Sequence, residues 1–535
     1  MTLKTFITVL FTVLCSLTMV ACGGGGGASS TNTSSTNTSS TNTSSANTSS
    51  ANTTTDSTET TDNSPVNTWV AGQYKSAQSF SNRCQTPRSN ANDQDLIGSV
   101  TDENNWIRSW SHETYLWYNE LPDIDPATIS DPIAYFDRMK TSAKTASGKN
   151  KDQFHFTYDT EKYNKLAESG ISAGYGANFV ITSSPQRIFV TFTEHNSPAA
   201  NANIGRGAEI LAIDNVLLDN INGQEDVDTI NSALYPSLGQ THTFVIKDLN
   251  AASERSVTLT SVEVTETPVY KTNIIEQGGQ KIGYLVLNTF GVATAEQQLI
   301  DAISILKDEA IDELILDLRY NGGGYLDISA ELGTMIAGNK ALGSVYEEMI
   351  FNDKLTSNNQ SRFFPSTAYG FSATIGVTLP KLNLSKIYIL STDNTASASE
   401  ALINGLRGID VEVILIGEPT TGKPYGFYPT DNCGTTYFTI QFKGTNAKGF
   451  GDYADGFIPS EEDNGTDQIV GCRVADDLSK VLGDENENML STALHHIQNS
   501  SCPTSSMAST VKPAHPLSAV HGELIRPYPV GLIIQ

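Results

Sequence analysis

The chain has 535 residues, a formal net charge of −26 at pH 7 and a pI of about 4.6. This length predicts several domains and leaves room for a large hydrophobic core. Because phosphate groups repel so acidic a surface, the charge argues against nucleic acid as a partner.

The first segment, Met1–Ala21, predicts a secretory signal peptide. Its apolar run, Phe6–Val20, is too short and too rich in threonine to suit a membrane span. The sequence MVAC that ends at Cys22 resembles a bacterial lipobox. The resemblance implies cleavage before Cys22, lipidation of that residue and an exported protein held at the cell envelope. By resemblance to bacterial sorting signals, Gly23 after the cysteine, in place of Asp, implies the outer membrane, facing either the periplasm or the surface. A plain signal peptide is the alternative.

Residues 22–66 form a low-complexity tether of glycines and TNTSS-like repeats, which lack the apolar side chains that a core needs.

Residues 78–168 predict a helical region, because aromatic residues recur in it at helical spacing. Such rings are more typical of core packing than of a sugar or cofactor site. The rings are those of Trp106, Trp110, Tyr115, Trp117 and Tyr118.

Residues 170–264 alternate apolar and polar residues in the manner of β-strands. The loop GYGA (174–177) and the later stretches SPAA and GRGAEILAID stand in the order found in PDZ domains, which this mainly-β region resembles. The resemblance implies that backbone N–H groups of Tyr175, Gly176 and Ala177 hold the carboxylate of a peptide C-terminus, while the peptide adds a strand. A generic β-domain without a ligand is the alternative.

Residues 268–500 alternate strands and helices, which predicts helices layered on a largely parallel sheet. Three motifs follow one another in this region: a glycine loop after a buried strand, NGGG (321–324), a turn into a helix, TASASE (395–400), and the loop GKP (422–424). A serine at a strand-to-helix turn is well placed to act as a nucleophile, because the helix N-terminus offers N–H groups to a developing anion. An ordinary helix cap is the alternative.

The three motifs, in this order, resemble those of the carboxy-terminal processing, or tail-specific, serine peptidases. The resemblance implies an α/β crotonase-like spiral core, with Ser397 as the nucleophile and Lys423 as the general base. It also implies an oxyanion hole made by backbone N–H groups of Gly323, rather than Gly324, and of Ala398. The substrates implied are exported or envelope proteins and peptides, recognised through their C-termini with the help of the PDZ domain. No cofactor and no metal is expected.

The chain departs from this family in two places. The spacing between Ser397 and Lys423 is one residue longer than usual, and Phe427 stands where the family often has a glutamine that orients the lysine. Glu400 and Tyr425 are the candidates for that orienting role. A catalytically inactive, peptide-binding envelope protein on a protease fold is therefore the alternative function.

Beyond residue 22 the chain has four cysteines, Cys84, Cys433, Cys472 and Cys502, and no CxxC motif, which argues against zinc and thioredoxin-like chemistry. In an exported protein an even number predicts disulfides. We expect Cys433 to pair with Cys472, because the two flank one Gly-rich segment of the same domain.

The tail, residues 503–535, is rich in serine and proline, and no function is predicted for it.

Overall fold

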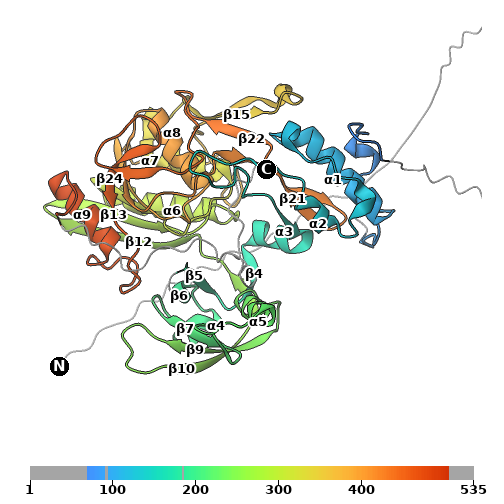
Figure 1. Cartoon of the computed structure of the whole chain (residues 1–535). Helices are drawn as coiled ribbons and strands as arrows, with labels where there is room; N and C mark the ends of the chain where they lie inside the picture. The colour runs from blue at the N-terminus through green and yellow to red at the C-terminus, as the bar shows by residue number, and fades with distance from the viewer. Residues whose placement is uncertain (1–68, 91–93, 184–185, 505–535) are drawn as a thin grey trace, which may run out of the picture. The chain divides into compact units, whose positions relative to one another are not determined.

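A seven-stranded sheet lies at the centre of the largest domain (Figure 1). The computed structural model describes residues 69–90, 94–183 and 186–504. The first two strands of the sheet pair antiparallel, and all other neighbours pair parallel. In spatial order the strands are β12 (Val269–Gln277), β13 (Gln280–Leu287), β14 (Glu313–Asp317), β17 (Lys386–Ser391), β18 (Glu412–Gly417), β24 (Gln468–Arg473) and β23 (Ile458–Ser460).

Helices cover both faces of this sheet, because successive side chains along its strands point to opposite faces and both sets are apolar. In β17, Ile387 and Ile389 pack in one core, whereas Tyr388 and Leu390 pack in another. The first core contains α6 (Ala295–Asp308), α7 (Leu326–Ala337) and α8 (Ala398–Gly408), and the second contains α9 (Asn488–Asn499). The prediction of helices layered on a largely parallel sheet is therefore confirmed.

Two smaller sheets extend this domain. A four-stranded antiparallel sheet has the order β16-β15-β22-β19, and a three-stranded antiparallel sheet has the order β20-β21-β3. Their strands are β3 (Phe156–Asp159), β15 (Val345–Phe351), β16 (Gln360–Phe363), β19 (Tyr425–Gly426), β20 (Thr430–Asn432), β21 (Thr435–Phe438) and β22 (Phe442–Thr445). Both sheets therefore contain strands from the chain that follows the GKP loop. The short 3-10 helices η4 (Gly338–Lys340) and η5 (Thr356–Asn358) lie in the connections.

The region before residue 170 contains helices, the two-residue strands β1 and β2, and strand β3 of the three-stranded sheet. Trp106 and Trp110 on α1 are buried and pack with Tyr437 of β21, so the aromatic residues at helical spacing form a core there. The elements are η1 (Ala77–Ser79), β1 (Arg83–Cys84), β2 (Leu96–Ile97), α1 (Val100–Thr114), η2 (Tyr118–Glu120), η3 (Pro126–Thr128), α2 (Pro132–Phe136) and α3 (Thr160–Ser169).

The segment after α3 folds as a mainly-β domain with its own core. Its principal sheet has the order β10-β9-β7-β6-β5, with β8 paired to β7, and β4 pairs with β11 outside it. All these pairs are antiparallel. The elements are β4 (Ile171–Gly174), β5 (Ala177–Ser183), β6 (Gln186–Thr193), α4 (Pro198–Asn201), β7 (Glu209–Ile213), β8 (Val216–Leu217), α5 (Gln224–Leu234), β9 (Thr241–Lys247), β10 (Arg255–Thr260) and β11 (Val262–Thr265).

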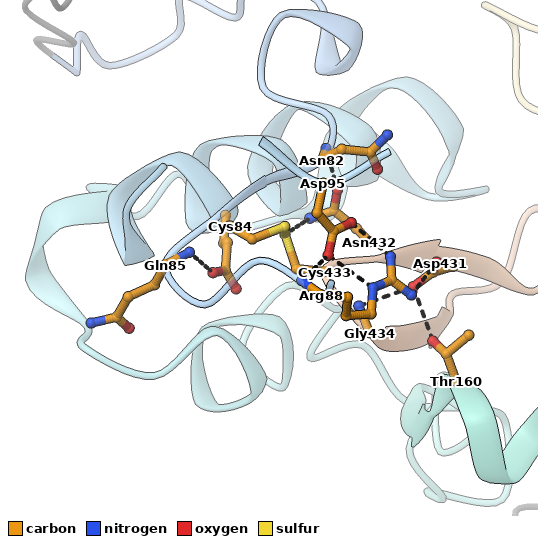
Figure 2. The surroundings of a disulfide bond; sticks show 11 residues. Asn82, Cys84, Gln85, Arg88, Asp95, Thr160, Asp431, Asn432, Cys433 and Gly434 are labelled. Carbon is orange, nitrogen blue, oxygen red and sulfur yellow. Dashed lines mark hydrogen bonds and ion pairs between the residues drawn. A yellow bond between two sulfur atoms is a disulfide. The ribbon is translucent and has the colours of Figure 1, made fainter. Parts of the chain in front are cut away.

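Two disulfides connect segments that lie apart in the sequence. Cys84 is bonded to Cys433, and Cys472 is bonded to Cys502, so the predicted pairing of Cys433 with Cys472 is wrong. Figure 2 shows the reason: Cys433 lies in the β20–β21 hairpin, which packs against the N-terminal region. Next to the bond, the Asn82 N–H donates to Asn432 Oδ1 at 2.8 Å. Tertiary packing, rather than proximity in sequence, therefore selects the partner.

Several sequence-based predictions concern residues outside those that the structure describes. These are the signal peptide, the lipidation of Cys22, the tether of residues 22–66 and most of the 503–535 tail. Within the described ranges, every helix is either too short or too polar to cross a membrane.

Candidate active site

Ser397 lies where the turn after β17 enters α8. Its φ of 63° and ψ of −115° place it in a conformation that costs a residue with a Cβ about 1–3 kcal/mol. The side chain is fully buried, and its Oγ has no hydrogen-bond partner among the described residues. A strained backbone and an unpartnered buried hydroxyl are common at functional positions. Glu400, three residues on, also accepts from the Ser397 N–H as in a capping box.

Glu400 connects the serine turn to the lysine loop. Its Oε2 accepts hydrogen bonds from the N–H of Ser397 at 2.9 Å and from the N–H of Lys423 at 2.8 Å. Its Oε1 accepts from the N–H of Gly422 at 2.7 Å and from the Thr420 hydroxyl. Burial raises the pKa of Glu400, and these hydrogen bonds oppose that rise. One buried carboxylate thus fixes the backbone of both predicted catalytic residues.

Lys423 is a fully buried lysine surrounded by aromatic rings. Its Nζ lies 4.0 Å from the centroid of the Phe427 ring and 5.1 Å from that of Phe154. Burial holds the pKa of Lys423 well below its ordinary value, and the carboxylates of Asp152 and Glu400 only partly oppose this effect. A lysine with a lowered pKa can be neutral near neutral pH and accept a proton.

The glycine loop packs against the serine turn. A Cβ at Gly323 would lie 2.7 Å from the Ser397 Cβ, and a Cβ at Gly324 would lie 2.1 Å from the backbone of Phe290, so neither position tolerates a side chain. Their φ values, 108° and 137°, also favour glycine. Glycine is therefore required at positions 323 and 324 by the close approach of three chain segments.

The N–H groups near Ser397 differ in what they bind. The N–H of Gly323 donates to Asn321 Oδ1 at 2.9 Å, whereas the N–H of Gly324 has no acceptor among the described residues. Ala398, the first residue of α8, is buried, and its carbonyl accepts from the Ser329 hydroxyl at 2.7 Å. An oxyanion at Gly323 would therefore have to compete with the Asn321 side chain for the same N–H group.

A cavity of about 810 Å³ extends from the glycine loop to the GYGA loop. Its wall contains aromatic residues of β3, α3 and β21, and its far end is bordered by β5 and the end of α5. The aromatic residues are Phe156, Tyr158, Tyr163 and Phe438. This volume accommodates several residues of an extended peptide.

The four GYGA residues line this cavity together with the glycine loop. Tyr175 is buried, and its carbonyl accepts from the N–H of Ala199 at 2.9 Å. Gly176 has a φ of 72°, and a Cβ there would lie 2.2 Å from the Ser197 Cβ. Ala177 begins β5 and pairs with Thr193 of β6. The cavity therefore joins the three residues predicted to bind a peptide carboxylate to the glycine loop.

A network of buried charges lies directly before the glycine loop. Arg319 forms ion pairs with Asp317, Glu487 and Asp476 at 2.7–2.9 Å. Asp476 also binds Arg206 of the β-domain at 2.6 Å, and both contact the Tyr320 hydroxyl. This network fixes the backbone segment around Arg319, which leads directly into the glycine loop.

Sequence reasoning missed three contributors to the site. Asn321 is the first residue of the NGGG motif, so its place directly before the glycines was a usable signal. Phe154 and Asp152 come from the N-terminal region, and nothing in their local sequence indicates contact with a lysine far along the chain. Within the described residues, no group of three or more His, Cys, Asp or Glu side chains could hold a metal ion.

Comparison with known proteins identifies the class to which the site belongs. Residues 281–429 match the model of Peptidase family S41, and residues 102–158 match that of the Peptidase S41 N-terminal domain. The first match contains Gly323, Ser397 and Lys423. The matches indicate a serine-type peptidase.

The relatives found by sequence carry names that agree with this class. A carboxyl-terminal-processing protease of Picosynechococcus sp. is 29% identical over 259 residues, which are 48% of this chain and 56% of that protein. A carboxy-terminal processing protease of Bacillus subtilis is 26% identical over 274 residues, which are 51% of this chain and 52% of that protein. The chain is thus a homologue of these proteases and spans about half the length of the curated relatives it matches.

A solved structure from Bacteroides fragilis NCTC 9343, described as an S41 protease, shares the fold. It superposes with a TM-score of 0.56 at 24% sequence identity and covers 77% of this chain and all of that chain. This similarity confirms the S41 protease fold.

Proposed function

We propose that the chain is a serine endopeptidase of the tail-specific type, in which Ser397 is the nucleophile and Lys423 the general base. One observation carries the proposal: Glu400 binds the backbone N–H groups of both residues. The serine has the strained conformation of an activated position, and the lysine is buried where its pKa is lowered.

The chemistry that this arrangement supports is acyl transfer to serine. The neutral Lys423 amine takes the proton of the Ser397 hydroxyl while Oγ bonds to the scissile carbonyl carbon, whose oxygen becomes an oxyanion. The resulting ammonium gives its proton to the leaving amine as the C–N bond breaks. Water then hydrolyses the acyl-serine, with the lysine again acting as base.

The oxyanion would be held by backbone N–H groups at the junction of the glycine loop and α8. Ala398 is the donor on the helix side, as the sequence predicts. On the loop side, Gly323 is the predicted donor and must then release Asn321 Oδ1. Gly324, whose N–H has no acceptor among the described residues, is the alternative donor.

The β-domain would act as a PDZ domain that recognises substrate C-termini. The cavity between the GYGA loop and the glycine loop supports this role, because a peptide held at one end can extend toward the other. The substrates would be exported or envelope proteins and peptides, since the chain itself is proposed to be exported. The MVAC sequence supports export, lipidation at Cys22 and a position at the cell envelope.

A catalytically inactive peptide-binding protein is the second candidate. Two observations favour it: Phe427 stands where related peptidases often have glutamine, and Ser397 is fully buried. On this alternative the cavity binds C-terminal peptides and Ser397 performs no chemistry.

A fluorophosphonate probe separates the two candidates, because it reacts only with an activated serine. We expect the wild-type protein to be labelled at Ser397 and to cleave an unfolded substrate, and Ser397→Ala to do neither. Binding of C-terminal peptides without labelling or cleavage by the wild type would replace the peptidase with the binding protein.

A further inference from the structure

Two phenylalanine rings face the lysine amine, and they come from distant parts of the chain. Phe427 follows Lys423 by four residues, and Phe154 lies between α2 and β3. The Nζ lies 4.0 Å from the first ring centroid and 5.1 Å from the second, both within the range of a cation–π contact. Both rings are buried, so solvent does not weaken these contacts.

The orientation of each ring is fixed by its neighbours. Phe427 makes edge contacts with Phe156 at 5.7 Å and with Phe438 at 5.3 Å. Phe154 packs with Tyr115 and Ile440, and its N–H donates to Asp152 at 3.0 Å. The two rings therefore present fixed faces to the amine rather than adapting to it.

We propose that Phe427 and Phe154 are positioning residues that hold Lys423 Nζ between ring faces and stabilise the ammonium formed when Ser397 loses its proton. The inference rests on the proposed function, in which Lys423 is the base. Phe427 would thereby take the place of the glutamine found in related peptidases, by a different interaction. An amide binds the amine through a hydrogen bond, whereas a ring face attracts its positive charge.

The two effects of the rings act at different stages of the reaction. At rest, apolar surroundings disfavour the ammonium and keep the amine available as a base. Once the proton has moved, the electron-rich ring faces attract the new charge, which exists only from the transition state onward. The charged groups that also act on Nζ are Asp152 and Glu400, and both favour the ammonium. Removal of a ring face at constant apolar volume should therefore lower both the rate and the pKa of Lys423.

The decisive experiment compares kcat and its pH dependence in Phe427→Leu, Phe154→Leu and the wild type. For Phe427→Leu we expect the high-pH plateau of kcat to fall about ten- to thirtyfold and its midpoint to move to lower pH by about one unit, with KM unchanged. Phe154→Leu should give smaller changes in the same directions, because its ring is farther from Nζ. Phe364→Leu is the matched control, since it removes a buried ring that packs against Tyr346.

A second pair of variants keeps the test valid if leucine disturbs folding. A trifluorinated phenylalanine at position 427 keeps the ring's shape and weakens the negative charge of its face, so it should reproduce the changes seen in Phe427→Leu. Phe427→Tyr keeps the ring face and should stay close to the wild type.

Two results would overturn the proposal while the wild type remains active and Lys423→Ala remains inactive. One is a Phe427→Leu profile equal to that of Phe364→Leu. The other is a midpoint that moves to higher pH, because that result means that the ring acts only by excluding water. Failure of the proposed function looks different: the wild type then cleaves nothing, or Lys423→Ala retains its activity.

Discussion

Arg319 and Lys423 are both buried basic side chains in the same domain, and their surroundings shift their pKa values in opposite directions. Arg319 is surrounded by the carboxylates of Asp317, Glu487 and Asp476. Burial alone would lower the pKa of Arg319, but these carboxylates raise it well above its ordinary value. Lys423 faces two phenylalanine rings, and burial keeps its pKa well below the ordinary value.

The contrast is the one expected between a structural cation and the reactive amine proposed for Lys423. A guanidinium cannot lose its proton in a protein, so its burial requires compensating charge. A lysine can lose its proton, and the absence of sufficient compensation makes it a base. The carboxylate of Glu400 contacts the lysine loop, but its hydrogen bonds go to the backbone of Ser397, Gly422 and Lys423 and to Thr420.

The largest expected effect is the loss of peptidase activity when Lys423 or Ser397 is replaced. Lys423→Ala and Ser397→Ala should each lower kcat/KM by at least about a thousandfold, because nucleophile and base act as a unit. Lys423→Arg should be equally inactive, because a guanidinium stays protonated and cannot take the serine proton. Cleavage assays on purified variants with unchanged circular dichroism test this prediction. Substantial cleavage by Lys423→Arg would show that the amine is not the base.

The next largest expected effect is a loss of folding stability when Arg319 is replaced. Arg319→Met leaves two fully buried carboxylates, those of Asp317 and Glu487, without their cation. We expect the free energy of unfolding to fall by about 3–5 kcal/mol in urea titrations. Lys281→Met is the control: its partner is Glu309, both side chains are exposed, and the change should stay within about 0.5 kcal/mol. Equal losses in the two variants would contradict the assigned role of Arg319.

The surroundings of Arg319 and Lys423 also show which parts of the site could be predicted from the sequence. The serine turn, the glycine loop and the lysine loop could be predicted as turns and loops because each is a local motif next to a strand. Their catalytic roles were implied by the family resemblance and stay predictions. Phe154, the partners of Arg319 and the cysteine pairs could not, because the fold brings them together from distant positions. The placement of Cys433 on a hairpin that packs against the N-terminal region has no local signal.

A smaller effect of opposite sign is expected when the lysine itself is made apolar. Lys423→Met removes a desolvated amine, so at pH 7 it should raise the free energy of unfolding. In the wild type the pKa of Lys423 is lower in the folded protein than in the unfolded chain. Between these two pKa values, Lys423 carries a proton in the unfolded chain but not in the folded protein. Wild-type stability therefore rises with pH in that window, and the difference from Lys423→Met should shrink toward pH about 10.4. A difference that does not change with pH would mean that Lys423 is charged in the folded protein.

The pKa of Lys423 is the central quantity of this account, and nuclear magnetic resonance of protein labelled with ¹³C at lysine Cε measures it directly. Comparison with Lys423→Met assigns the resonance. We predict that this resonance titrates at a markedly lower pH than the ordinary lysine value of about 10.4, since burial disfavours the ammonium. Titration near that ordinary value would contradict a neutral Lys423 and with it the proposed dyad.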